Sequence, residues 1–181
     1  RAIRRQKPDP IPDQDIRAIL DAAIQAPNGG NMQPWHFLVV TDDSLRAQFA
    51  PLYHEAWWAK RHDSGWYTPD DLPDAYKGPM QLADEIGNSP VLIFVCALAK
   101  GAAAANSIIP SVQNLLLAAR ALGVGSTITT LHPTIEGRVH ALFDIPDTAQ
   151  VVYCLPLGYP KGNFGPVNRM PLEEVSSFNT W

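Results

Sequence analysis

A long apolar stretch near the middle of the chain places the strongest limit on its fold. Residues 108–122 carry apolar side chains on nearly every face, and Gly123 follows as a helix stop, so the pattern predicts one helix. Pro110 fits this helix only in the first turn, where its missing N–H is not needed. A helix that is apolar all round must be buried all round. In a chain of 181 residues it is therefore either a central core helix or part of a subunit interface.

Helical and extended patterns alternate along the rest of the chain. Apolar residues with helical spacing predict further helices over residues 13–25, 43–58, 80–86 and 134–143. Shorter apolar runs predict strands over residues 36–41, 90–97, 124–129 and 150–157. The second of these runs is continuously apolar, which is typical of a strand covered on both faces. We therefore expect an α+β fold in which helices surround one mixed central β-sheet, in a single domain over residues 1–181.

Composition excludes several kinds of protein. Hydrophobic content of 46% with 18% charged residues is typical of a folded globule. The net charge of -4 and the lack of a basic run argue against a nucleic-acid surface. No apolar stretch reaches the about 20 residues of a membrane span, and no secretory signal is visible. Cys96 and Cys154 lie in predicted buried strands without a CxxC pair, which favours packing roles and a reducing cytoplasm.

The loop between the first helix and the first strand is unusually polar. Residues 26–37 include two glycines, which allow close backbone approach, and Asn28, Asn31 and Gln33, which are uncharged donors and acceptors. Pro34 stiffens the end of the loop. These residue types suit the rim of a flat, polar-edged heterocycle. An ordinary Asn-Gly turn would have the same composition.

A second irregular segment, residues 55–80, is long for a connection in a compact domain. Such loops are usually functional lids or disordered. Its aromatic side chains are Trp57, Trp58, Trp66 and Tyr67. These residues form either an aromatic lid that stacks on a planar substrate or a packed surface at a dimer interface, where aromatic residues are also favoured.

Four motifs, in order along the chain, carry a family resemblance. They are Arg1-Ala-Ile-Arg-Arg5 with the prolines of residues 8–12, Ala26-Pro-Asn-Gly-Gly-Asn-Met-Gln-Pro-Trp35, Leu115-Leu-Leu-Ala-Ala-Arg-Ala-Leu-Gly-Val-Gly-Ser126, and Leu157-Gly-Tyr-Pro160 with Arg169-Met-Pro-Leu172. Together they resemble the nitroreductase family of flavoproteins. The resemblance implies an FMN cofactor and an intertwined homodimer in which a C-terminal arm, about residues 160–181, embraces the partner.

The resemblance also implies which residues hold FMN. Guanidinium groups match phosphate oxygens bidentately, and Arg1, Arg4 and Arg169 are carried over to the phosphate, while Arg5 is expected to point outward. The cofactor-binding residues expected in this way are Arg1, Ala2, Ile3, Arg4, Asn28, Gly29, Asn31, Gln33, Ile128, Thr129, Thr130 and Arg169. Gln33 is expected near the ring, from the same or the partner subunit. Ile128, Thr129 and Thr130 are the candidates to face the flavin N5 atom. Ala2 and Gln6 depart from the serine and phenylalanine that the family often has there.

Without the resemblance, these segments have simpler interpretations. The N-terminal basic run would be a solvated flexible end. Residues 126–131 would be the exit of a strand whose hydroxyl groups face the solvent. Five histidines show no metal-ligand spacing, and no metal is expected.

The activity implied is hydride transfer from NADH or NADPH through FMN to nitroaromatic or quinone-like acceptors. Gly123-Val-Gly125 follows a helix and lacks the third glycine of a dinucleotide fingerprint, so the nicotinamide is expected to dock transiently, with ping-pong kinetics. No protein acid or base is required, because the flavin carries the redox chemistry. Three alternatives remain open: a reductive dehalogenase whose lid is imitated by Glu55, Tyr67 or Tyr76 and Lys60 or Lys77, a flavin-degrading enzyme, and a non-catalytic FMN-binding protein. A deazaflavin is an alternative donor.

Overall fold

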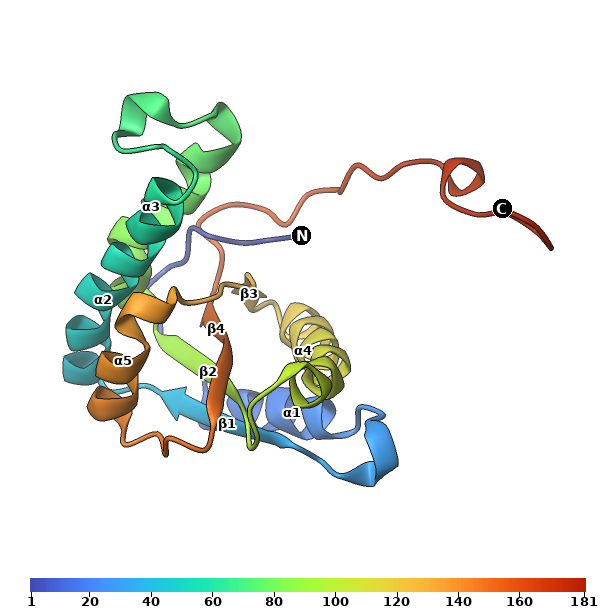
Figure 1. Cartoon of the computed structure of the whole chain (residues 1–181), viewed down its shortest axis with the longest axis horizontal. Helices are drawn as coiled ribbons and strands as arrows, with labels where there is room; N and C mark the ends of the chain where they lie inside the picture. The colour runs from blue at the N-terminus through green and yellow to red at the C-terminus, as the bar shows by residue number, and fades with distance from the viewer.

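A four-stranded sheet forms the middle layer of the computed structural model, which describes residues 1–181 (Figure 1). Its strands, in the spatial order β1-β2-β4-β3, are β1 (Trp35–Val40), β2 (Val91–Ala97), β4 (Gln150–Gly158) and β3 (Gly125–Ser126). Every neighbouring pair is antiparallel, whereas we expected a mixed sheet. β1 and β2 are antiparallel because of their connection. One helix leads the chain away from the sheet and a second returns it to the end at which β1 stopped, so β2 runs in the opposite direction.

Helices cover both faces of this sheet (Figure 1). One face is covered by α1 (Asp13–Ile24) and α4 (Ala102–Ala121), and the other by α2 (Asp43–His62), α3 (Lys77–Glu85) and α5 (Glu136–Phe143). The side chains of β2 alternate between two cores: Ile93 and Val95 pack with α1 and α4, while Leu92 and Phe94 pack with the other three helices. All of β2 is buried, as its continuous apolar pattern predicted.

Helix α4 begins six residues earlier than expected and is not buried all round. The alanines from Ala102 onward are strong helix formers and extend it, so Pro110 lies inside the helix rather than in its first turn. Its inner side packs on α1 and the sheet, so this helix, which is long and apolar enough to cross a membrane, is a core helix here. Ile109 and Leu117 on its outer side are 50% and 58% exposed. The outer side is thus an uncovered apolar surface.

The N-terminal segment lies flat across the end of the sheet. The Ile3 amide donates to the Ser126 carbonyl at 2.9 Å. The buried Gln6 amide group donates to the carbonyls of Gly125 at 3.2 Å and Pro156 at 2.9 Å. These bonds tie the start of the chain to β3 and β4, and Gln6, a departure from the family pattern, makes two of them.

Gly125 allows this close approach, and we expect Gly125→Ala to displace the segment. A Cβ at position 125 would lie 2.6 Å from Cγ2 of Ile3, which is buried and cannot easily move. Overpacking of this kind lowers the free energy of unfolding by about 1–3 kcal/mol. Urea denaturation measures the loss, and trypsin cleavage after Arg4 and Arg5 should become faster.

Gly137→Ala is the matched control, because nothing lies within 4 Å of a Cβ built there, in α5. This change should leave stability equal or slightly higher, since alanine is the better helix former. A Gly125→Ala protein as stable and as resistant to trypsin as the control would show that the close contact is not needed.

Helix α2 runs to His62, so the first residues of the predicted excursion are helical. The connection to α3 then contains two short 3-10 turns, at Pro69–Asp71 and Asp74–Tyr76. At the other end of the chain, the arm from Pro160 leaves the body of the protein (Figure 1). It ends with Phe178 at 88% exposure and Trp181 fully exposed. Neither aromatic side chain is covered by its own chain.

Candidate active site

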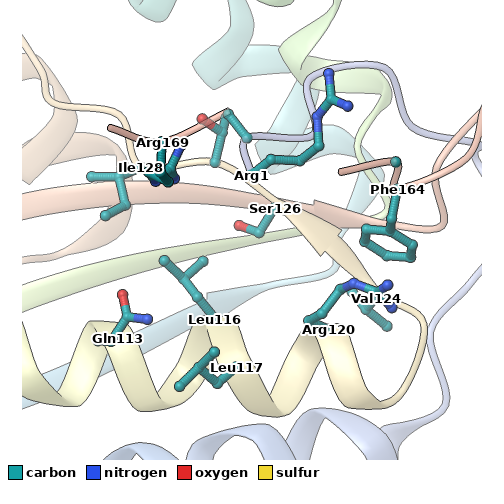
Figure 2. Close-up of a pocket in the computed structure, with 13 residues that line it drawn as sticks. Arg1, Gln113, Leu116, Leu117, Arg120, Val124, Ser126, Ile128, Phe164 and Arg169 are labelled. Carbon is teal, nitrogen blue, oxygen red and sulfur yellow. The ribbon is translucent and has the colours of Figure 1, made fainter. Parts of the chain in front are cut away.

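A positively charged cavity of about 470 Å³ lies between α4, β3 and the C-terminal arm (Figure 2). Helix α4 forms its floor, and the arm and the N-terminus lie above it (Figure 2). Three guanidinium groups line it, those of Arg1, Arg120 and Arg169, and no carboxylate does. The chain as a whole is negative, so the local charge at the cavity has the opposite sign to the net charge. It fits an anionic ligand.

The two ends of the chain meet at this cavity. The Arg1 Nη1 atom donates to the Pro166 carbonyl at 3.3 Å. Gly165 has a left-handed backbone with φ of 58°, and a Cβ there would lie 2.8 Å from the same Nη1 atom. Phe164 stacks on the Arg120 guanidinium at 3.6 Å. These contacts hold the arm across the cavity and bring Arg169 to its wall.

A buried hydroxyl group provides a test of whether a phosphorylated cofactor fits. Ser126 is 8% exposed, lines the cavity, and its Oγ has no hydrogen-bond partner in the protein. A buried polar group without a partner is costly, so a ligand that hydrogen-bonds to it would be stabilising. An orphan hydroxyl beside three guanidinium groups suits a phosphorylated polyol chain such as that of FMN. Ala2 lines this wall too, whereas the Ile3 side chain is buried beneath it.

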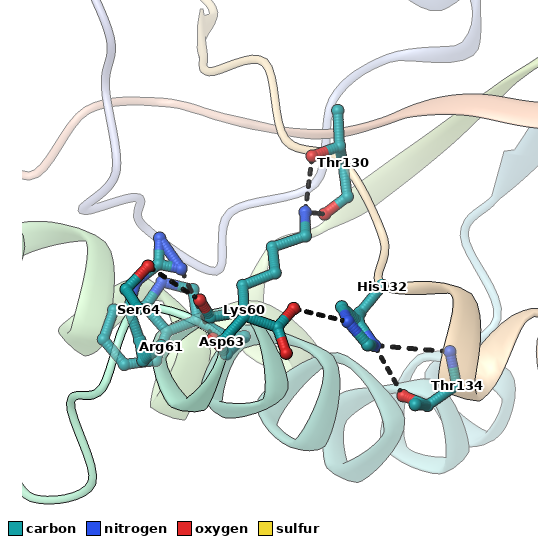
Figure 3. A network of polar contacts seen from close by, with 8 residues as sticks. Lys60, Arg61, Asp63, Ser64, Thr130, His132 and Thr134 are labelled. Carbon is teal, nitrogen blue, oxygen red and sulfur yellow. Dashed lines mark hydrogen bonds and ion pairs between the residues drawn. The ribbon is translucent and has the colours of Figure 1, made fainter.

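A second pocket, of about 220 Å³, continues from the first along residues 127 and 128. Three cations line it, Arg4, Lys60 and Arg61, again without a carboxylate. Lys60 Nζ donates to both the carbonyl and the hydroxyl oxygen of Thr130, each at 2.5 Å (Figure 3). Burial and the adjacent Arg61 guanidinium lower the pKa of Lys60. On the pocket wall, burial raises the pKa of Tyr53 to about 12, so its phenol stays neutral.

The three candidates to face N5 differ in how they are placed. The backbone amide and carbonyl of Thr129 both hydrogen-bond to the backbone of Cys154, and the Thr129 hydroxyl donates to the Cys154 carbonyl at 2.6 Å. Its hydroxyl is therefore already used within the sheet. Ile128 is 48% exposed and lines both cavities, and Thr130 is exposed beside Lys60. Residues 127 and 128 leave the ladder, so β3 is shorter than the strand expected over 124–129.

Only one of the four predicted lid residues lines this pocket. Trp57 is buried in its wall, and Trp58 packs edge-on against Trp57 from outside. Trp66 packs edge-on against Tyr76, a lining residue, and Tyr67 stacks on His62. These three aromatic side chains thus form a layer around the pocket rather than its lining.

Sequence reasoning did not select Arg61 or Tyr76 for the cofactor site. The Arg61 guanidinium lies 4.5 Å from the centre of the Trp57 ring and 4.9 Å from that of Tyr76. Trp57 and Arg61 are four residues apart, which puts them on one helical face. This spacing was not recognised because the helix was expected to end at residue 58, before Arg61. Arg120 and Phe164 were also missed, since their contact depends on the path of the arm.

The amide-rich loop lies away from both cavities. Its residues Asn28, Gly29, Asn31 and Gln33 line neither of them, and the loop adjoins the start of α4, where the Gly29 Cβ position is 3.8 Å from Ser107 Oγ. The large cavity uses residues 113–120, toward the other end of that helix. Asn31 and Gln33 have φ of 53° and 47°, and Asn28 Oδ1 accepts from the Gln33 amide at 2.8 Å. Positive φ is uncommon for residues other than glycine, although asparagine adopts it more often than most.

The layered α+β fold and a cavity lined by three guanidinium groups suit an oxidoreductase that binds a phosphorylated cofactor. Comparison with known proteins gives the family: the model of the nitroreductase family matches residues 1–159, and the chain belongs to this family. The resemblance seen in the sequence is therefore confirmed, and with it the fold class and the oxidoreductase class.

Several relatives cover nearly the whole chain. An NADH dehydrogenase of Thermus thermophilus is 30% identical, covering 97% of this chain and 90% of that protein. An iodotyrosine deiodinase of Thermotoga neapolitana is 27% identical, covering 97% of this chain and 90% of that protein. The solved structure of the FMN-dependent nitroreductase NfnB from Mycobacterium smegmatis, in complex with NADPH, is 22% identical with a TM-score of 0.77, covering 99% of this chain and 94% of that chain.

Proposed function

We propose that the protein is an FMN-dependent reductase that oxidises NADH or NADPH and reduces nitroaromatic or quinone-like acceptors, as a homodimer in the cytoplasm. One observation carries this proposal. Two connected cavities around residues 126–130 are lined by six cations and no carboxylate, in a chain of net charge -4. The family and the NADPH bound to a nitroreductase of the same fold support it.

The chain's own residues would bind and orient rather than react. Arg1 and Arg169 would hold the phosphate, with Ser126 on the polyol chain and Arg4 at the passage to the second pocket. FMN, when bound, would supply the hydride transfer between donor and acceptor. Trp57, Tyr53 and Tyr76 would exclude water from the second pocket and offer flat faces to an aromatic acceptor.

The homodimer is proposed from three uncovered surfaces. The outer side of α4 exposes Ile109 and Leu117, the loop exposes Met32 at 78%, and the arm exposes Phe178 and Trp181. A partner chain could cover these exposed apolar side chains, which their own chain leaves open to solvent. A second copy of the chain would cover them and add its loop, residues 28–33, to a groove that one chain builds without it.

Anaerobic addition of NADH or NADPH is expected to bleach the yellow colour of the FMN-loaded protein. Subsequent addition of a nitroarene or quinone should restore it, and steady-state rates should give the parallel double-reciprocal lines of a ping-pong mechanism. Stopped-flow absorbance at the flavin band measures both half-reactions. A protein that stays yellow with both nicotinamides would be a non-catalytic binder or would use another donor, such as a deazaflavin.

A reductive dehalogenase is the second candidate, because an iodotyrosine deiodinase is among the relatives. Lys60 and Tyr76, two residues considered for its lid, do line the second pocket. Glu55, the third, instead pairs with Arg138 of α5. Iodotyrosine in the acceptor panel separates the two reactions, since only a dehalogenase would release iodide.

A further inference from the structure

We propose that the acceptor of this enzyme is an aromatic carboxylate, whose anionic group binds Lys60 and Arg61 in the second pocket. This inference rests on the proposed reductase function and names the substrate class of the same site. It follows from three features of the pocket: its cations lack anionic partners, no carboxylate lines it, and its walls include aromatic side chains.

The two cations are positioned but not neutralised. Two of the three Lys60 N–H groups are used by Thr130, which leaves one free, and Lys60 forms no ion pair. The Arg61 guanidinium lies near two aromatic rings, and its only hydrogen bond runs from Nη1 to the Trp57 carbonyl at 3.3 Å. Arg61 also forms no ion pair. Both groups are partly buried, where an unpaired charge is costly, so an anion in the pocket would be strongly favoured.

Four of the five carboxylates between residues 55 and 74 are bound to other groups, and the fifth, Asp70, does not line the pocket. Glu55 pairs with Arg138, Asp63 accepts from the His132 ring at 3.0 Å (Figure 3), and Asp74 pairs with Lys77 at 2.7 Å. Asp71 accepts from the backbone amides of Tyr67 and Thr68. None of these carboxylates lines the pocket. An ammonium group would therefore meet only like charge there, which favours an anionic acceptor over a zwitterionic amino acid.

The remaining wall specifies the rest of the ligand. Trp57 and Tyr76 present aromatic faces, and Pro79 and Leu82 are apolar. The volume of about 220 Å³ suits a single substituted ring rather than a dinucleotide. A benzoate-like molecule would place its ring between these walls and its carboxylate at Lys60 and Arg61, beside residues 127–130.

Binding of two matched ligands tests the inference without turnover. Benzoate and neutral benzamide are titrated into the oxidised FMN-loaded protein, and the flavin spectrum or the tryptophan fluorescence is followed. Lys60→Met and Arg61→Gln should each weaken benzoate binding about tenfold, because each removes a charge-assisted hydrogen bond, and should change benzamide binding less than about twofold. Lys60→Arg, which keeps the charge, should retain most of the preference. Lys77→Met, an exposed lysine outside the pocket, is the control.

A turnover experiment uses protein whose flavin has been reduced photochemically, so that no nicotinamide is needed. Reoxidation by 4-nitrobenzoate should exceed that by 4-nitrobenzamide, and Lys60→Met should remove the difference. Equal binding of the two ligands to the unaltered protein would overturn the inference. The inference would also fail if Lys60→Met slowed only the reduction of the flavin by NADPH and not its reoxidation by 4-nitrobenzoate. The cations would then bind the phosphate of the donor. If neither nitro compound reoxidises the flavin, the reductase proposal fails, while the binding titration still decides the inference.

Discussion

Replacing Arg1 and Arg169 together by alanine is expected to abolish FMN retention, with Kd for FMN raised at least about a hundredfold. Each arginine would lose a charge-assisted hydrogen bond to the phosphate, which contributes about 1.5–3 kcal/mol, so two such losses correspond to two or more orders of magnitude. Both side chains line the same cavity, and Arg120, which packs on Phe164, would be the one guanidinium left there. Titration of the apoprotein with FMN, followed by flavin fluorescence, measures the change.

Riboflavin, which lacks the phosphate, makes this prediction specific. Its affinity should change little in the double variant, because the lost contacts are to the phosphate alone. Arg17→Ala is the control for net charge, since Arg17 is exposed on α1 and lines neither cavity. If FMN and riboflavin were weakened equally, the two arginines would act by holding the arm and the N-terminus in place rather than by binding phosphate.

The parts of the fold that the sequence predicted well are those with a single local explanation. β2 is a continuous apolar run and α1 a regular amphipathic pattern, and both lie within one or two residues of the expected ranges. The errors have particular causes. The last turn of α2, with Lys60 and Arg61, was missed because its polar side chains face the solvent and the pocket and so break the apolar pattern. The start of α4 at Ala102 was missed because a run of alanines shows no apolar periodicity.

The candidate site shows the same division. Arg1, Arg4, Arg169 and residues 128–130 are far apart in the sequence, and only a family motif could group them; the structure places them around two connected cavities. Lys60, Arg61 and Tyr76 take their roles from tertiary contacts that local patterns do not encode. The loop of residues 28–33 was expected to join these groups, and within one chain it does not.

The position of that loop leads to the second large expected effect. The loop adjoins the start of α4 and the cavity adjoins its C-terminal half, so a single chain keeps them apart. If the apolar outer side of α4 packs against its copy across a two-fold axis perpendicular to the helix, the two helices are antiparallel. The start of one helix then lies near the end of the other. Each loop would complete the cavity of the partner.

Two inactive variants are therefore expected to restore activity when they share a dimer. One carries Asn31→Gly and Gln33→Gly, which remove the loop side chains but keep the left-handed backbone that both positions require. The other carries Arg1→Ala and Arg169→Ala. In a heterodimer, purified with two different affinity tags, one site collects both defects and the other has none. NADPH-dependent reduction of a nitroarene should then reach about half the rate of the unaltered dimer, because a two-fold dimer holds two equivalent sites. If the loop served its own chain, both sites of the heterodimer would be defective and the rate would not exceed that of the parents.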